Sequence, residues 1–218
     1  MISFWPALSG DEYALAFDTG RKHRVLVLPA LFDEGNKLRH FTVELMRRLD
    51  AGGVDSFLPD LPGCNESDSP LEEQTLAAWQ AGTLAAAAHF AATHVLTIRG
   101  GAMLDPGHLP GWRYSPASGS SQLQTMLRAQ VIAAREAGRI EKREGLLECG
   151  RLEGLSLAGY RLGSLMVAEL ADAELPATVC SDIPQGQLGG PALWLRAEPE
   201  HDAAQCDMLA RIVLEALA

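Results

Sequence analysis

The stretch His94-Val95-Leu96-Thr97-Ile98-Arg99-Gly100-Gly101 decides the fold of this chain. Its first five residues predict a short buried strand, and Arg99 with the two glycines predicts a tight turn that opens a helix. A strand, a sharp turn and a helix form the setting of a nucleophile elbow, whose pattern is Gly-x-Ser-x-Gly. The attacking hydroxyl is absent here, although the glycine needed after the turn is present, because the five places hold Thr97, Ile98, Arg99, Gly100 and Gly101.

Strand and helix patterns alternate on both sides of this stretch. We expect strands at residues 13–18, 24–28, 54–59, 94–98, 112–115, 152–158, 178–181 and 192–196, the first two joined as a hairpin. We expect helices at residues 37–51, 70–92, 164–173 and 203–217, and one that begins at residue 120 or 121. The alternation predicts an α/β fold with an open, mainly parallel sheet and helices on both faces. Ligands of such sheets bind at the carboxyl ends of the strands.

Length and composition set outer limits on the protein. The 218 residues, 47% of them apolar, can bury one substantial core, so we expect a single domain over residues 1–218. The net charge of -10 contains no long run of one sign, which argues against nucleic acid or an anionic membrane as a partner. We see no secretory signal and no apolar window of the ~20 residues that a membrane span needs, so we expect a cytoplasmic protein.

Metal and cofactor sites are not predicted. The four cysteines are far apart and form no Cys-x-x-Cys pair, so they indicate neither a zinc knuckle nor a dithiol motif. None of the six histidines stands at metal-ligand spacing on a helix face with another ligand. We therefore expect no metal and no cofactor.

Five motifs occur in the order of a known family. They are Glu34-Gly35-Asn36-Lys37-Leu38-Arg39, Asp60-Leu61-Pro62-Gly63-Cys64-Asn65-Glu66-Ser67, Ile98-Arg99-Gly100-Gly101, Trp112-Arg113-Tyr114-Ser115-Pro116 with Leu123-Gln124-Thr125-Met126-Leu127-Arg128 beyond it, and Leu157-Ala158-Gly159-Tyr160-Arg161-Leu162. On these motifs the chain resembles the alpha/beta hydrolases and, among them, the group called exosortase A system-associated hydrolase 2. The resemblance covers approximately residues 24–170.

The resemblance implies a shortened alpha/beta-hydrolase-like three-layer sandwich from a bacterium, with a link to exopolysaccharide production. It also implies that an arginine at the elbow is a trait of the group. One departure concerns the helix after the elbow, which is normally long. Between Gly101 and Trp112 there is room for only a short helix, interrupted by Pro106.

Two residues occupy the places of a catalytic acid and base. His201 follows the predicted strand at 192–196, and Asp182 follows the weak strand at 178–181, in the chain order of this fold. The alternatives are an exposed helix start for His201 and a turn former for Asp182. Ser115, Ser118 and Cys64 are the other candidate nucleophiles, but none stands on an elbow, and loop roles are favoured for each.

Arg99 has two interpretations that remain open. Beside the amides of Gly100 and Gly101 at a helix N-terminus, its guanidinium could bind a carboxylate or phosphate. The first loop would complete such a site through Glu34, Asn36 and Lys37. Alternatively, Arg99 forms an ion pair with a loop acid, either Glu34 or Asp60.

Three functions follow from these alternatives. The first is a protein of the hydrolase fold without the serine nucleophile, either a degenerate hydrolase or a binder of a small anion. The second is an active esterase or acyl hydrolase with a displaced nucleophile. The third is a non-catalytic accessory interaction protein. The sequence leaves open whether the protein is an enzyme and what its oligomeric state is.

Overall fold

The computed structural model describes residues 1–7 and 10–218, and its centre is a sheet of seven strands. Five neighbouring strands run parallel, and two further strands are added at one edge through antiparallel pairings. The strands follow the order β1 (Ile2–Ala7), β2 (Gly10–Phe17), β4 (Asp55–Pro59), β3 (Arg24–Leu28), β5 (His94–Ile98), β6 (Gly111–Tyr114) and β9 (Ser181–Ile183). The expected open, mainly parallel sheet is confirmed.

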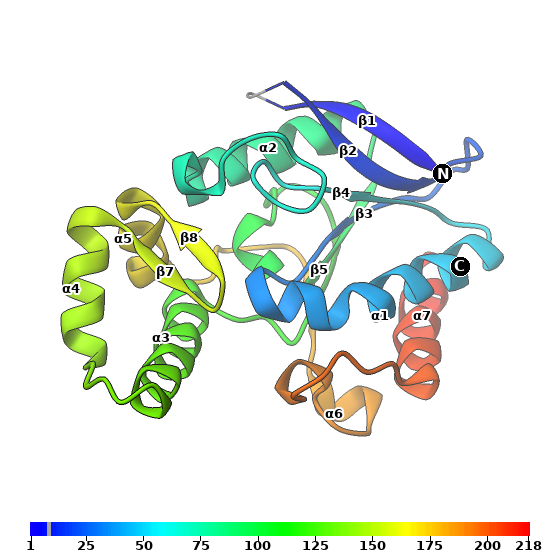
Figure 1. Ribbon diagram of the computed structural model, residues 1–218. Helices are drawn as coiled ribbons and strands as arrows, with labels where there is room; N and C mark the ends of the chain where they lie inside the picture. The colour runs from blue at the N-terminus through cyan, green and yellow to red at the C-terminus, as the bar shows by residue number, and fades with distance from the viewer. Residues whose placement is uncertain (8–9) are drawn as a thin grey trace.

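Helices cover both faces of this sheet (Figure 1). On one face lie α1 (Phe32–Ala51) and α7 (Ala203–Leu217), and the opposite face carries α2 (Leu76–His89) and α5 (Ser164–Asp172). The remaining elements are α3 (Gly119–Glu136), α4 (Arg143–Glu153), the hairpin of β7 (Leu155–Leu157) and β8 (Tyr160–Leu162), α6 (Gln185–Leu188), and the 3₁₀ helices η1 (Leu71–Glu73), η2 (Arg99–Leu104) and η3 (Leu193–Leu195). The layers of helix, sheet and helix are those of the expected sandwich, whereas the single domain over residues 1–218 stays a prediction.

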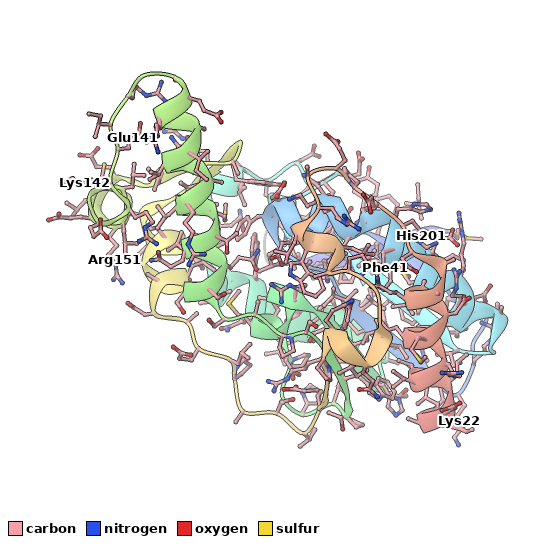
Figure 2. All side chains as sticks on the ribbon, turned by 90° about the horizontal axis from the view of Figure 1, so that it is seen from below. Lys22, Phe41, Glu141, Lys142, Arg151 and His201 are labelled. Atoms are coloured by element: carbon pink, nitrogen blue, oxygen red, sulfur yellow. The ribbon has the colours of Figure 1, made fainter. Side chains whose placement is uncertain are left out.

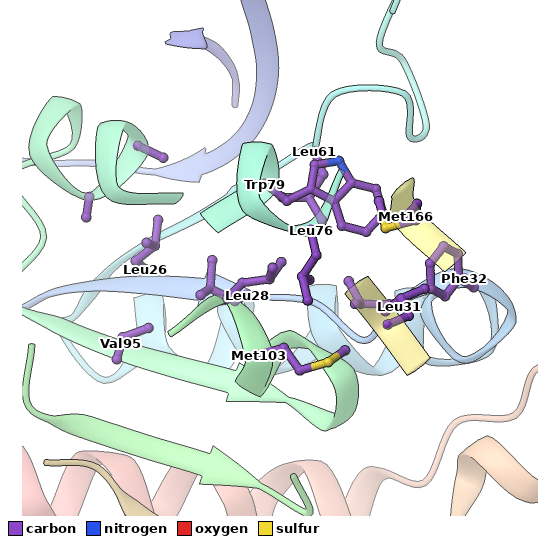
Figure 3. Packing of buried hydrophobic residues seen from close by; sticks show 14 of the residues in the cluster. Leu26, Leu28, Leu31, Phe32, Leu61, Leu76, Trp79, Val95, Met103 and Met166 are labelled. Carbon is purple, nitrogen blue, oxygen red and sulfur yellow. The ribbon is translucent and has the colours of Figure 1, made fainter. Parts of the chain in front are cut away.

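The alternation of side chains along β3 explains the two cores. Val25 and Val27 pack in the cluster under α1 and α7, whereas Leu26 and Leu28 pack in the cluster with α2 and α5. All four side chains are fully buried, because successive residues of a strand face opposite sides and both sides are covered here. Figure 3 shows Leu26 and Leu28 with residues of the second cluster, among them Trp79 and Met166.

The hairpin expected between residues 13–18 and 24–28 is wrong. The two strands are not neighbours, since β2 pairs with β1 and β4, and β3 lies between β4 and β5. The link between them is held instead by the buried carboxylate of Asp55, which accepts hydrogen bonds from the backbone amides of Thr19 and Arg21 at 3.1 and 2.8 Å. A long-range acceptor therefore replaces the local turn that the sequence suggested.

Four other expected elements differ from the structure. The predicted helix at 70–92 divides into η1 and α2, because the Thr75 hydroxyl caps α2 by accepting from the Ala78 amide. The predicted strand at 152–158 contains the end of α4 and the short strand β7, and the weak strand at 178–181 lies at Ser181–Ile183. Residues 192–196 form η3 rather than a strand, with Trp194 turned inward and Leu195 exposed to solvent.

We predict that Gly101→Ala destabilises the protein by about 1 to 3 kcal/mol, the usual cost of overpacking. A Cβ at Gly101 would stand 2.4 Å from the Pro29 oxygen and 2.6 Å from the Leu28 oxygen, and backbone atoms yield little. The matched control is Gly145→Ala in α4, where no atom beyond the neighbouring helix backbone lies within 4 Å of the added Cβ and helix propensity favours alanine. Urea unfolding measures both, and equal stability of Gly101→Ala and the wild type would contradict the close approach.

Candidate functional site

Arg99 occupies the sharp turn between a central strand and a helix, as the sequence predicts. It follows β5 directly, begins η2, and has a backbone φ of 52°. This left-handed conformation is uncommon for a residue with a side chain and costs of order 1–3 kcal/mol. The turn therefore has the strained strand-to-helix geometry of an elbow, although η2 is a 3₁₀ helix of only 6 residues.

Residues with a positive φ also follow three other strands of the sheet. Positive φ angles occur at Phe32 after β3 (55°), Asn65 after β4 (51°) and Ser115 after β6 (45°). Together with Arg99 they place one such residue beyond the carboxyl end of each of four neighbouring strands. Strained backbone concentrates at functional sites, and ligands of open parallel sheets bind at this edge.

The guanidinium of Arg99 is occupied by three groups of the protein itself. Its Nε and Nη2 donate to the two carboxylate oxygens of Glu34 at 3.0 and 3.1 Å, and Nη1 donates to the Ser115 carbonyl at 2.8 Å. The indole ring of Trp194 lies over it, 4.1 Å from ring centroid to Cζ. The side chains of Arg99 and Glu34 are 16% and 10% exposed, so the pair is largely buried.

Of the two partners considered for Arg99, the structure therefore has Glu34. Glu34 lies in the first turn of α1, where the helix dipole stabilises a carboxylate. Asp60 is bonded to other groups, namely Nη1 of Arg39 at 3.3 Å and the side-chain amide of Asn65 at 2.7 Å. Trp194 is a partner that the sequence did not suggest, since its segment was predicted as a strand.

The glycines after Arg99 are needed for close packing. A Cβ at Gly100 would stand 2.5 Å from the side-chain oxygen of Gln122, and Gly101 lies against the backbone of β3. Gln122 is buried and donates from its amide nitrogen to the Leu31 carbonyl at 3.4 Å. The side chain of Gln122 thus packs against Gly100 and leaves no room for a Cβ there.

A cavity of about 250 Å³ opens beside the turn, between the start of α1, the loop after β4 and the β7–β8 hairpin. Its floor is apolar, whereas its polar lining includes Asn36, Arg39, Asn65 and Tyr160. Asn36 donates to the Tyr160 hydroxyl at 2.7 Å and so joins α1 to the hairpin. Asn36, Asn65 and Tyr160 all lie in the motifs quoted above, but only the fold brings them to one cavity.

The residues expected to bind one ligand lie in three different places. Asn36 lines the cavity, whereas Arg99, Gly100 and Glu34 are not among its lining residues. Lys37 forms an ion pair with Asp33 at 2.7 Å, one turn earlier on α1. The groups expected to form one anion site therefore belong to a packed turn, a cavity wall and a helix surface.

His201 and Asp182 have separate surroundings. The His201 ring packs on the ring of His40, 4.6 Å between centroids, and Figure 2 shows it near Phe41 of α1. Asp182 lies within β9 rather than after a strand, and it accepts from Nε of Arg113 at 2.7 Å. Among the described residues, no hydrogen bond or ion pair links His201 to Asp182. The strand expected before His201 is η3.

The other candidate nucleophiles have structural partners. The Ser118 hydroxyl caps α3 by accepting from the Ser121 amide at 3.3 Å, and the carbonyl of Ser115 accepts from Arg99. Burial, with the charges of Asp60 and Glu12, raises the pKa of the Cys64 thiol to about 12. Since the thiolate is the nucleophilic form, a thiol with this pKa is unreactive near neutral pH.

Metal and membrane features can be judged only over the described residues. Within residues 1–7 and 10–218, no group of three or more His, Cys, Asp or Glu side chains is arranged to hold a metal ion. In the same part of the chain, no helix is both long and apolar enough to cross a bilayer.

Comparison with solved structures identifies the fold. Alpha/beta hydrolase domain-containing protein 10 from mouse is similar over 100% of this chain and 98% of its own, with 13% identity and a TM-score of 0.61. Est1E from Butyrivibrio proteoclasticus is similar over 99% of this chain and 97% of its own, with 11% identity and a TM-score of 0.61. A further Est1E structure, with bound ferulic acid, has a TM-score of 0.58 at 14% identity, over 99% of this chain and 98% of its own.

These similarities define the class of structure. The chain has the alpha/beta-hydrolase fold. No protein-family model and no curated protein sequence matches the chain.

We predict that Arg99→Ala lowers the free energy of unfolding by about 3 kcal/mol, because it leaves the Glu34 carboxylate buried without its partner. The matched control is Arg47→Ala, which removes an exposed pair with Glu44 on α1 and should change stability little. Urea unfolding compares the two variants. A small loss for Arg99→Ala, together with stabilisation of the wild type by small anions in thermal melts, would instead support Arg99 as an anion-binding group.

Proposed function

We propose that this protein is a non-hydrolytic member of the alpha/beta-hydrolase fold and that it acts by binding a small molecule. The observation that carries the proposal is the bidentate ion pair of Arg99 with Glu34 at the elbow. A guanidinium cannot act as a nucleophile, because it stays protonated and has no lone pair to offer. With both carboxylate oxygens of Glu34 bound to it, the pair fixes the loop of α1 to the turn after β5.

Three features support the absence of hydrolysis. The acid and base candidates, Asp182 and His201, are bonded or packed elsewhere, to Arg113 and His40. Gln122 lies against the turn where an oxyanion would be held. The Cys64 thiol lines the cavity, but its pKa of about 12 keeps it protonated. A displaced nucleophile therefore lacks an activating base among these candidates.

We propose that the neighbouring cavity, rather than Arg99, binds the anion. Arg99 and Arg39 both have a carboxylate partner, but Arg99 is bound by both oxygens of Glu34 and by the Ser115 carbonyl, which leaves few of its N–H groups for a ligand. Arg39 lines the cavity, makes one bond to Asp60, and has amide and hydroxyl groups around it. We assign ligand binding to this cavity and a structural role to Arg99.

Active-site-directed fluorophosphonate probes should not label the wild-type protein. The rate of hydrolysis of 4-nitrophenyl esters should exceed the uncatalysed rate in water by at most about 10³- to 10⁴-fold, which is the acceleration that binding and oxyanion stabilisation give without a nucleophile. Labelled protein would be digested and the modified residue identified by mass spectrometry. The variants Ser115→Ala and Ser118→Ala serve as matched controls for non-specific labelling. Stoichiometric labelling of one serine that disappears in one of these variants would establish the displaced-nucleophile enzyme and reject the proposal.

We also propose that the protein serves exopolysaccharide production in the cytoplasm of a bacterium. Support comes from the motif resemblance, which includes both residues of the Arg99–Glu34 pair. Deleting the gene in its host should reduce or alter the secreted polysaccharide, and a plasmid copy should restore it. Unchanged polysaccharide in the deletion strain would contradict this role and leave the binding function to be tested separately.

A further inference from the structure

We infer that the cavity beside α1 is a binding site for a small monocarboxylate with a short apolar tail, and that Arg39 is its charged anchor. The inference rests on the proposed function, because it names the ligand class of the binding site proposed above. The lining residues of the cavity, its size and its position at the sheet edge each support one part of this assignment.

The charge of the lining favours an anion. Among the described residues that line the cavity, Arg39 is the one charged side chain, and none of them carries a carboxylate. Arg39 uses a single N–H, Nη1, in its bond to Asp60, and its side chain is 40% exposed. A carboxylate could therefore bind the remaining N–H groups of the guanidinium, and such charge-assisted bonds are the strong ones.

The start of α1 adds a second favourable element. Leu31, Phe32, Gly35 and Asn36 line the cavity, and they are the N-cap and three of the first five residues of a helix of 20 residues. Its N-cap, Leu31, supplies no side-chain hydrogen bond to the first amides. The positive end of the helix dipole and uncapped N–H groups both favour negative charge. The acidic residues Asp33 and Glu34 of the same turn are themselves paired, with Lys37 and Arg99.

The apolar lining and the volume limit the rest of the ligand. Leu31, Leu58 and Leu61 are among the lining residues, and they favour a ligand with an apolar part. The volume of about 250 Å³ suits a small ligand. We take hexanoate as the probe, because it joins one carboxylate to a short apolar chain.

Tyr160 closes the cavity on the side of the hairpin. Its hydroxyl accepts the hydrogen bond from Asn36, and its ring meets Phe32 edge-on at 5.6 Å between centroids. The bond from Asn36 leaves the hydroxyl proton of Tyr160 free to be donated to a ligand oxygen. We expect Tyr160 to orient the ligand and Arg39 to supply most of the charge recognition.

The test is isothermal titration of the wild-type protein with hexanoate and with hexanamide, the neutral isostere. Hexanoate should bind, and hexanamide should bind at least tenfold more weakly. Arg39→Gln should weaken hexanoate binding by tenfold to a hundredfold, and Arg39→Lys by less, because lysine keeps the charge without the fork. The matched control is Arg47→Gln, an equal change of charge two turns along α1, which should leave the affinity unchanged.

Each result decides the inference. Equal affinity for hexanoate and hexanamide, or an unchanged affinity in Arg39→Gln, would overturn the anion site, and absence of binding by both ligands would overturn the site altogether. These failures differ from failure of the proposed function, which would appear as enzymatic hydrolysis of 4-nitrophenyl hexanoate by the wild type. In that case hexanoate would be a product, and its dependence on Arg39 would still test the site.

Discussion

The bidentate ion pair between Arg99 and Glu34 is the constraint on which the functional edge of this molecule depends. It joins the turn after β5 to the first turn of α1, and Arg99 also binds the carbonyl of Ser115 beyond β6. Three neighbouring strands are therefore connected at their carboxyl ends by one side chain. A buried pair with satisfied hydrogen bonds fixes geometry more than it adds net stability, because desolvation offsets much of its attraction.

This arrangement changes what the hydrolase fold can do. In an enzyme of this fold, the elbow presents a side chain to the substrate with open space and amide donors beside it. Here the elbow side chain is turned into the protein, covered by Trp194, and the space against Gly100 is filled by Gln122. The strained backbone of the turn is kept, with a φ of 52° at Arg99, although in the proposed function the turn presents no nucleophile.

Two arginines at the same sheet edge, Arg39 and Arg99, differ in burial and in the number of their bonds. Each of them is bonded to a carboxylate. Arg99 donates two hydrogen bonds to Glu34, whereas Arg39 donates one to Asp60. The side chain of Arg39 is 40% exposed, against 16% for Arg99. The guanidinium of Arg39 is therefore the less saturated and the more accessible of the two, which is why the proposed ligand site is placed there.

The sequence by itself determined the elements whose signal is local. The strands at 24–28 and 94–98 were predicted with their observed bounds, because continuous apolar runs of this length are typical of strands buried on both faces. The helix predicted at 203–217 also has its observed bounds, and its start depends on a local contact, since the Asp202 carboxylate accepts from the Gln205 amide three residues on. The turn at Arg99 was also predictable, because it depends on the strand before it and the glycines after it.

Only the tertiary structure decided the features that depend on distant partners. The choice of Glu34 rather than Asp60 for Arg99, the role of Asp55 in place of a hairpin turn, and the meeting of Asn36 with Tyr160 all join residues at least 34 positions apart. The segment at 192–196 has the composition of a strand, yet it became η3, where Trp194 covers Arg99. The sequence lists the groups able to make such contacts, but which contacts form is decided by burial, and burial belongs to the folded chain.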